Sequence, residues 1–326
     1  MANIKDVAKK AGVGIATVSR VINNSGYVKK ETREKIEQVI KDIGYVPNEI
    51  ARSMTKQATN IIAFVLPNSS HIFFSELLYY VETELYEHGY KLMVCNSASN
   101  LEKELDYISM LKKNRVDGII FLTSTDVEKY LDPKLPIISF DRHFKGIPFV
   151  ASDNYEGGRI AAKILLSTRP KKMLFIGDDA QGELSSITTE VSKRRIGFSE
   201  YLKEHHYNNV KIIEYPQGTE HIPVKFINEL VGEHLDYDAI FAISDMLAHI
   251  VIEALEAYGK RVPEDVKIIG YDGVKSYLNL GKQISSIEQP VADIAKVITN
   301  SILARINGKT VKSTILPVSY KQGDTV

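Results

Sequence analysis

The feature that most constrains the fold is a change of pattern near residue 60. Beyond it, strand-length apolar runs alternate with longer segments whose apolar residues recur at helical spacing. The strand-like runs are 61–66, 91–95, 118–122, 137–140, 173–177, 210–215, 239–243 and 266–270, and the helical segments are 74–88, 101–113, 157–166, 193–204, 224–233, 248–258 and 291–306. Alternation of this kind predicts parallel sheets with helices on both faces. There are enough elements for two doubly wound α/β lobes, with one more strand expected near residues 313–318.

Residues 4–43 lack this alternation and predict three short helices, at 4–11, 15–23 and 30–43. Gly12 ends the first helix and Gly44 the third, and a loop over residues 23–26 separates the second from the third. Two helices joined by a tight turn that contains Gly are typical of a helix-turn-helix motif. The second helix of such a motif points its N-terminal residues at base edges in the major groove of DNA.

Charge is distributed unevenly along the chain. Although the formal net charge is zero, the first 60 residues hold eleven Lys and Arg against six Asp and Glu. A basic head on an acidic body indicates a polyanionic partner for the head alone. The single cysteine, Cys95, excludes an internal disulfide framework. Without an apolar leader or a membrane-length apolar run, we expect a cytoplasmic protein that does not enter a membrane.

A specific family resemblance follows from the headpiece run IKDVAKKAGVGIATVSRVINNSGYVKKETREKIEQVIKDIGYVPNEIARSM. It resembles the headpiece of the lactose-repressor (LacI/GalR) family, and the landmarks DGII, SDN with GG, RRIGF and IIGYD extend the likeness through the chain. The resemblance implies an all-α headpiece followed by two lobes of the periplasmic-binding-protein type. It also implies a homodimer on a pseudo-palindromic operator, with a sugar or sugar phosphate bound between the lobes.

The resemblance also implies domain boundaries. We expect a helix-turn-helix domain at 1–46, a hinge helix and linker at 47–59, and an effector-binding and dimerisation domain at 60–326. Within that domain we expect one lobe at about 60–154 with 289–314 and the other at 155–288 with 315–326.

The DNA-binding residues are carried over from the family motif by position. Ile15 and Ala16 match the sequence-reading positions, but both are apolar and could contact only thymine methyls. Arg20 matches the third reader and could pair with a guanine or a phosphate, whereas Gly14 stands where Ser is usual. The family's hinge helix matches residues 48–56, with Met54 in place of a Leu that wedges into the minor groove. The remaining expected DNA-binding residues are Ile4, Thr17, Ser19, Asn23, Thr32, Tyr45, Asn48 and Ala51.

The expected effector site combines aromatic faces with charged groups, because sugar rings stack on aromatics and sugar hydroxyls need many directed hydrogen bonds. The matching positions are Phe73, Phe74, Asp141, Arg194, Ser244 and Asp272. Phe73 or Phe74 could instead belong to the core, and Asp245 could cap its helix.

The identity of the effector stays open at this point. The segment PNSSHIFFSELLYYVETELYEHGYKLMVCNS resembles sucrose-operon repressors, and the end of the headpiece is also similar to ribose-operon repressors. Arg142, His143 and Arg194 could hold the phosphate of a sugar phosphate.

A corepressor-dependent global carbon regulator is the alternative function. With no HExxH, GxSxG or P-loop motif present, we expect no enzyme activity, no catalytic residue, no metal and no cofactor.

Overall fold

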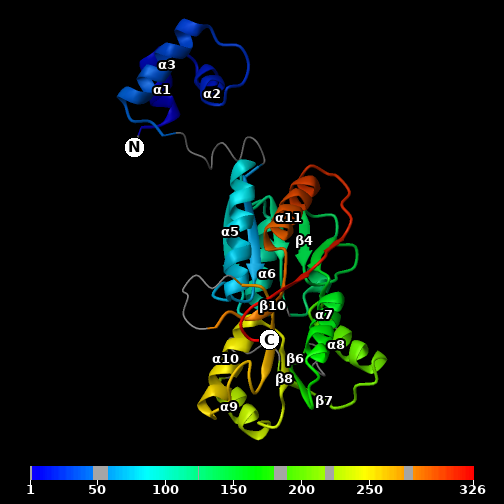
Figure 1. Cartoon of the computed structure of the whole chain (residues 1–326). Coiled ribbons are helices and arrows are strands. Elements are labelled where there is room, and N and C mark those ends of the chain that lie inside the picture. The colour runs from blue at the N-terminus through cyan, green and yellow to red at the C-terminus, as the bar shows by residue number, and fades with distance from the viewer. Residues whose placement is uncertain (1, 47–57, 124, 180–188, 217–223, 275–281) are drawn as a thin grey trace. The chain divides into compact units, whose positions relative to one another are not determined.

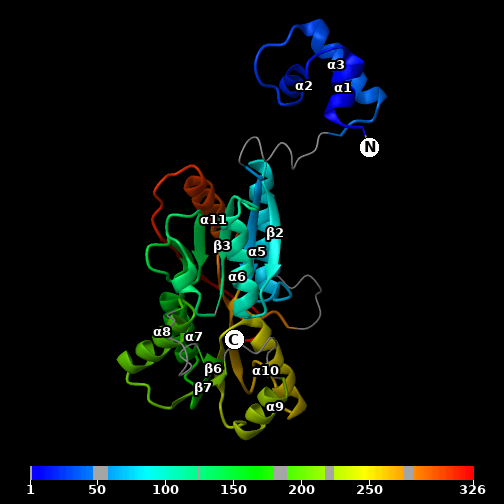
Figure 2. The same cartoon turned by 180° about the vertical axis from the view of Figure 1, so that it is seen from behind.

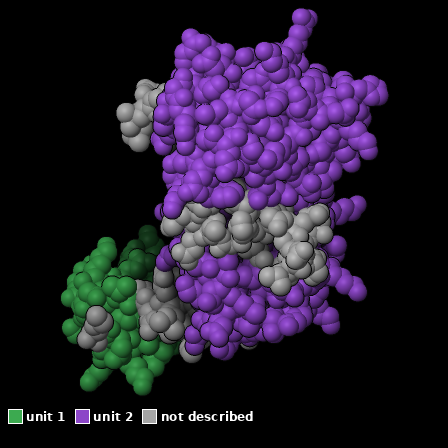
Figure 3. All heavy atoms as spheres, turned by 90° about the horizontal axis from the view of Figure 1, so that it is seen from below, with its two compact units in different colours: residues 1–59 green, residues 60–326 purple. Residues whose placement is uncertain are grey.

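The structure is a computed structural model that describes residues 2–46, 58–123, 125–179, 189–216, 224–274 and 282–326. The chain falls into two compact units, Met1–Thr59 and Asn60–Val326, which are coloured separately in Figure 3. We describe each unit by itself and call them the headpiece and the body. None of the described helices is long and apolar enough to cross a membrane.

The headpiece contains the three expected helices, α1 (Ile4–Ala11), α2 (Ile15–Ile22) and α3 (Lys30–Asp42). They enclose a small core that consists of Val7, Ala8, Ala11, Val18, Val21 and Ile36. Helix α1 begins with a capping box: Asn3 Oδ1 accepts from the backbone N–H of Asp6, and Asp6 Oδ2 accepts from the backbone N–H of Asn3. The left-handed Gly12, at φ 68°, ends α1 and starts the tight turn into α2.

The first lobe of the body has a six-stranded parallel sheet in the order β11-β5-β4-β3-β1-β2. Its strands are β1 (Ile61–Leu66), β2 (Lys91–Asn96), β3 (Gly118–Phe121), β4 (Ile137–Phe140), β5 (Phe149–Ser152) and β11 (Thr314–Leu316). Helices α5 (Ile72–Glu87) and α11 (Val291–Ile306) cover one face, and α6 (Leu101–Lys112) covers the other (Figure 1). Both faces of strand β1 are apolar and need a cover: Ile62 and Phe64 pack with α5 and α11, and Ala63 and Val65 pack with α6.

The second lobe repeats this plan with the order β12-β10-β9-β8-β6-β7. Its strands are β6 (Met173–Asp179), β7 (Val210–Pro216), β8 (Ala239–Ala242), β9 (Lys267–Asp272), β10 (Ser285–Glu288) and β12 (Ser319–Lys321), and its helices are α7 (Asn154–Ser167), α8 (Ser192–Glu204), α9 (Val224–Glu233) and α10 (Asp245–Ala257). Only the edge pair β10 and β12 is antiparallel among the described strands. Both views of the chain show α7 with α8 and α9 with α10 on opposite sides of this sheet (Figures 1 and 2). Two doubly wound lobes are thus confirmed.

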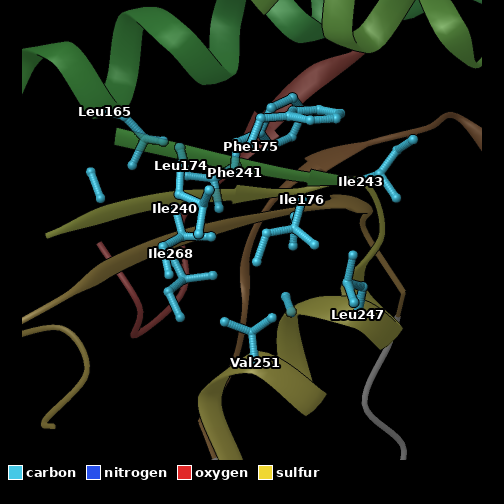
Figure 4. Packing of buried hydrophobic residues seen from close by; sticks show 14 of the residues in the cluster. Leu165, Leu174, Phe175, Ile176, Ile240, Phe241, Ile243, Leu247, Val251 and Ile268 are labelled. Atoms are coloured by element: carbon cyan, nitrogen blue, oxygen red, sulfur yellow. The ribbon is translucent and has the colours of Figure 1, made fainter. Parts of the chain in front are cut away.

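The core of the second lobe forms where its helices meet the sheet. Leu165 of α7 lies on one side of the strands, and Leu247 and Val251 of α10 lie on the other (Figure 4). The rings of Phe175 and Phe241 contact each other edge to face, with their centroids 5.4 Å apart. This packing fixes the strand ends that carry the polar groups described below.

The expected strand near residues 313–318 is confirmed as β11, but a second short strand, β12, follows it and was not expected. The two strands lie in different sheets: β11 pairs with β5 in the first lobe, and β12 pairs with β10 in the second. Ile315 and Leu316, which we assigned to the second lobe, therefore belong to the first. Pro317 lies between the two strands. The lobes are joined by three crossings, before α7, before α11 and between β11 and β12.

Candidate functional site: a DNA-binding headpiece and a cleft between two lobes

The start of helix α2 is the exposed part of the headpiece that the DNA-reading hypothesis requires. Ile15 is 46% exposed, and Ala16 and Arg20 are exposed as well. Gly14 is the N-cap of this helix and supplies no side-chain cap. An apolar pair followed one turn later by a guanidinium can contact thymine methyls and one guanine or phosphate.

The other expected DNA-binding residues are less exposed. Thr17, Ser19, Asn23 and Thr32 are half-buried, and Ile4 and Tyr45 are half-buried against the headpiece core. The Asn23 amide donates to Ser19 Oγ at 3.2 Å, which orients both side chains. Asn48, Ala51 and Met54, with the rest of the expected hinge helix, lie outside the described residues.

Tyr27, in the loop between α2 and α3, is 85% exposed and is not among the expected DNA-binding residues.

The body's candidate site centres on Arg194, which α8 presents at the ends of the second lobe's strands. Its Nε donates to Asn154 Oδ1 at 2.7 Å, and its Nη1 donates to the backbone carbonyl of Ile243 at 2.8 Å. Nη1 also lies 3.5 Å from Asp272 Oδ1, and the guanidinium stacks on the Tyr271 ring, 3.6 Å from its centroid. These contacts hold a buried guanidinium in one orientation before any ligand arrives.

Helix α8 can bring Arg194 to this place because two glycines let it touch α7. A Cβ on Gly197 would lie 2.0 Å from the carbonyl oxygen of Tyr155, and one on Gly158 would lie 2.0 Å from that of Arg194. The backbones of the two helices are therefore in direct contact, which only glycine permits.

Two buried carboxylates complete the charged part of the site. Asp141 follows β4 in the first lobe and Asp272 ends β9 in the second, and both have positive φ, 53° and 106°. Such backbone strain in non-glycine residues clusters at binding sites. Burial raises the pKa of Asp141 to about 7, Arg194 lowers it, and Glu190 and Asp272 raise it. Asp141 Oδ1 is buried without a hydrogen-bond partner among the described residues.

Asp272 is oriented by an amide that sequence reasoning did not identify. Gln289 Nε2 donates to Asp272 Oδ1 at 2.8 Å, and the Gln289 Oε1 accepts from the Ser152 hydroxyl at 2.6 Å. Gln289 precedes α11 at one lobe crossing and Asn154 begins α7 at another. Only the positions of Gln289 and Asn154 at the lobe crossings could have indicated their role in the sequence, because a neutral amide belongs to no recognisable motif.

Three of the six expected effector residues, Asp141, Arg194 and Asp272, come together in this way. Phe73, in contrast, is a core residue, 3% exposed and stacked on Phe140. Phe74 is half-buried beside the His71 ring at 4.8 Å and remains the aromatic candidate.

Ser244 has a structural contact in place of a free hydroxyl. Its Oγ accepts from the backbone N–H of Leu247 and caps α10. Asp245, our expected cap, instead accepts from the Ser286 hydroxyl at 2.6 Å and from the backbone N–H of Val274 at 2.8 Å. Burial and, to a lesser extent, the charge of Asp272 together raise the pKa of Asp245 to about 8.

The two lobes also contact each other across the site. The backbone N–H of Glu190, just before α8, donates to the carbonyl of Asp141 at 2.9 Å. The Glu190 carboxylate pairs with His143 of the first lobe and, at 2.6 Å, with Lys193 of the second. A change in the angle between the lobes must therefore alter contacts made by Asp141 itself.

A hollow of about 220 Å³, open to solvent, lies beside Asp272. Glu76 and Tyr80 of α5 and Gln289 contribute to its wall.

Comparison with known proteins identifies the two units. Residues 3–48 match the family of bacterial regulatory proteins called the lacI family. Residues 59–323 match the periplasmic binding proteins and sugar binding domain of the LacI family. The chain belongs to the lacI family. It is therefore a regulator with a helix-turn-helix DNA-binding headpiece, and the members of its family are transcriptional regulators rather than enzymes.

Individual relatives agree with this assignment. This lacI-family chain is 38% identical over 330 residues to the sucrose operon repressor of Streptococcus mutans, covering the whole of both chains. A LacI family transcriptional regulator from Enterococcus faecium, solved with bound ribose, is 26% identical with a TM-score of 0.70, over 81% of this chain and 98% of that one. The lac repressor dimer bound to operator shares the fold, with a TM-score of 0.83 over 99% of this chain and 98% of that one at 20% identity.

Proposed function

We propose that this chain represses a carbohydrate-utilisation operon in the cytoplasm, has no catalytic role, and is released from DNA by a sugar. In this account the protein binds a pseudo-palindromic operator as a homodimer through α2 of each headpiece. The effector lies between the lobes of the body, against Arg194, Asp141 and Asp272.

The single observation that supports this proposal most is the preorganised Arg194. The chain fixes a buried guanidinium with Asn154, Ile243 and Asp272 at the point where strand ends of the second lobe face the first lobe. Open α/β sheets bind ligands at such carboxyl ends of strands. The printed names of the relatives, a sucrose operon repressor and a regulator with bound ribose, support a sugar as the ligand.

A mechanism follows from the contacts between the lobes. Ligand hydroxyls that bind Arg194 and Asp141 together would favour one angle between the lobes, because Asp141 moves with the first lobe and Arg194 with the second. The energy available to change the DNA affinity equals the difference in the sugar's affinity for the two states. The same logic requires no corepressor, and the names of the relatives do not favour the alternative of a corepressor-dependent global carbon regulator.

Selection from a random duplex library tests the DNA-binding part of the proposal. The purified chain should enrich a pseudo-palindrome whose half-sites are related by the two-fold axis of a dimer. Footprinting should then show protection of both half-sites. Enrichment of a single asymmetric site, or no enrichment above a basic control protein, would contradict the proposal.

A further inference from the structure

Three basic side chains, Arg142, His143 and Arg194, were expected to be able to hold a phosphate. The first of them, Arg142, already has hydrogen-bond partners within the protein. Arg142 is buried, and its Nη1 donates to the backbone carbonyl of Thr123 at 3.0 Å and to that of Thr125. Its guanidinium also stacks on the Phe144 ring at 4.5 Å. The buried Glu104 and other nearby carboxylates offset its charge, while burial lowers its pKa to about 10. Arg142 therefore links loops of the first lobe.

The other two candidates, His143 and Arg194, each lie close to a carboxylate. His143 pairs with Glu190, which is buried and shared with Lys193, and its ring stacks on Phe149 at 3.9 Å. Arg194 has Asp272 at 3.5 Å. A phosphate would have to compete with these carboxylates or approach them closely.

The surroundings of Asp272 are acidic. The described wall of the hollow contains the carboxylates of Glu76, Asp272, Glu288 and Asp293, and the Lys321 ammonium lies beside this wall, 4.0 Å from Glu288. Asp141 adds a further buried carboxylate next to Arg194. Because these carboxylates outnumber the nearby ammonium, like-charge repulsion in this part of the molecule disfavours a dianion.

We propose that the cleft is built for an uncharged polyol, a free sugar, and discriminates against the phosphorylated form of the same sugar. This inference rests on the proposed sugar-binding function and narrows its ligand class. Asp141 Oδ1, buried and without a partner among the described residues, is the acceptor for a sugar hydroxyl. A guanidinium has five N–H donors, so Arg194 keeps donors for a second hydroxyl oxygen.

The preference for a free sugar over its phosphate should depend on pH if Asp141 contributes to it. At pH 8 the Asp141 carboxyl, with its pKa of about 7, is mostly ionised, whereas at pH 6 it is mostly protonated and can also donate a hydrogen bond to a sugar. The phosphate group, with a second pKa of about 6, becomes a full dianion over the same interval. Repulsion is therefore greatest at pH 8.

Calorimetric titration of the full chain with matched ligands tests the inference. The probes are sucrose against sucrose 6-phosphate and ribose against ribose 5-phosphate, at pH 6 and pH 8. We expect one free sugar to bind at least about tenfold more tightly than its phosphate at pH 8, with a smaller ratio at pH 6. Tighter binding of a phosphate would overturn the inference and leave the proposed function standing. If none of the four ligands bound, the sugar-binding function itself would be contradicted, and the inference with it.

An isosteric variant ties the result to the named residue. Asp141→Asn removes the charge without breaking a hydrogen bond of Oδ1 among the described residues. In this variant the ratio of the affinities for free sugar and sugar phosphate should change with pH only as much as the ionisation of the phosphate itself requires. The variant should also bind the phosphate more tightly than the wild type does. The matched control is Glu102→Gln, which removes an exposed carboxylate from α6 and should leave the ratio unchanged. An unchanged ratio in Asp141→Asn would refute the role of Asp141.

Discussion

Replacing Gly197 by Ala tests whether the α7–α8 contact positions the effector site. The added Cβ would lie 2.0 Å from the carbonyl oxygen of Tyr155, which is backbone and cannot rotate away. Because non-bonded heavy atoms sit at about 3.5 Å or more, the helices must separate locally by roughly 1.5 Å. Overpacking of this kind costs about 1–3 kcal/mol. For a body of this size that corresponds to a melting temperature lower by about 2–12 °C.

The same displacement moves Arg194, which is less than one helical turn from Gly197 on α8. Its bonds to Asn154 and to the Ile243 carbonyl are 2.7 and 2.8 Å long and would be lost or weakened by such a shift. We expect the affinity for the sugar to fall at least about tenfold.

Differential scanning calorimetry and sugar titration measure the two effects of Gly197→Ala. The matched control is Lys203→Ala, which removes an exposed side chain from the same helix and should change neither quantity. Wild-type melting temperature and wild-type sugar affinity in Gly197→Ala would refute the reasoning, because the helices would then have room that the structure denies them.

Three further predictions concern single side chains. Arg20→Ala should abolish the preference for operator over random DNA in competition binding but leave sugar affinity intact, and loss of sugar binding would contradict the separation of the two sites. Asn3→Ala breaks the capping box of α1 and should destabilise the headpiece by about 1 kcal/mol in thermal unfolding, and a stability equal to wild type would show that the cap is dispensable. The folded body holds the Asp141 proton more tightly than the unfolded chain, since burial raises this pKa from 3.8 to about 7, so stability should fall as the pH rises from about 4 to about 7. Asp141→Asn should reduce that slope in denaturant titrations, and an unchanged slope would show that Asp141 does not carry it.

The main architecture could be predicted from the sequence because it depends on patterns that span many residues. Strand–helix alternation after residue 60 predicted two doubly wound lobes, and the three-helix headpiece followed from apolar spacing with Gly12 and Gly44 as stops. The exchange of the last strands between sheets could not be predicted in this way. Both strands are three residues long, and their partners, β5 and β10, are distant in the chain.

The site was predictable only where charge marks it. Asp141, Arg194 and Asp272 follow strand ends or lie in a recognisable motif, whereas Gln289 and Asn154 are neutral amides whose role comes from tertiary contacts. Phe73 and Phe74 are neighbours on α5, and only packing decides that the first belongs to the core. Ser244 illustrates a competing use, since a hydroxyl at a strand end can cap the following helix instead of binding a ligand.

The most direct test of the central claim is the operator affinity of the full chain with and without sugar. Fluorescence anisotropy of a labelled operator obtained from the duplex selection gives the dissociation constant in each condition, at a fixed salt concentration because protein–DNA affinity depends on salt. The account predicts that a saturating sugar that binds the cleft weakens operator binding at least about tenfold. It also predicts that the same sugar leaves operator binding unchanged in a variant whose cleft no longer binds it. Equal operator affinity with and without a sugar that demonstrably binds the cleft would contradict the claim that the cleft controls the headpiece.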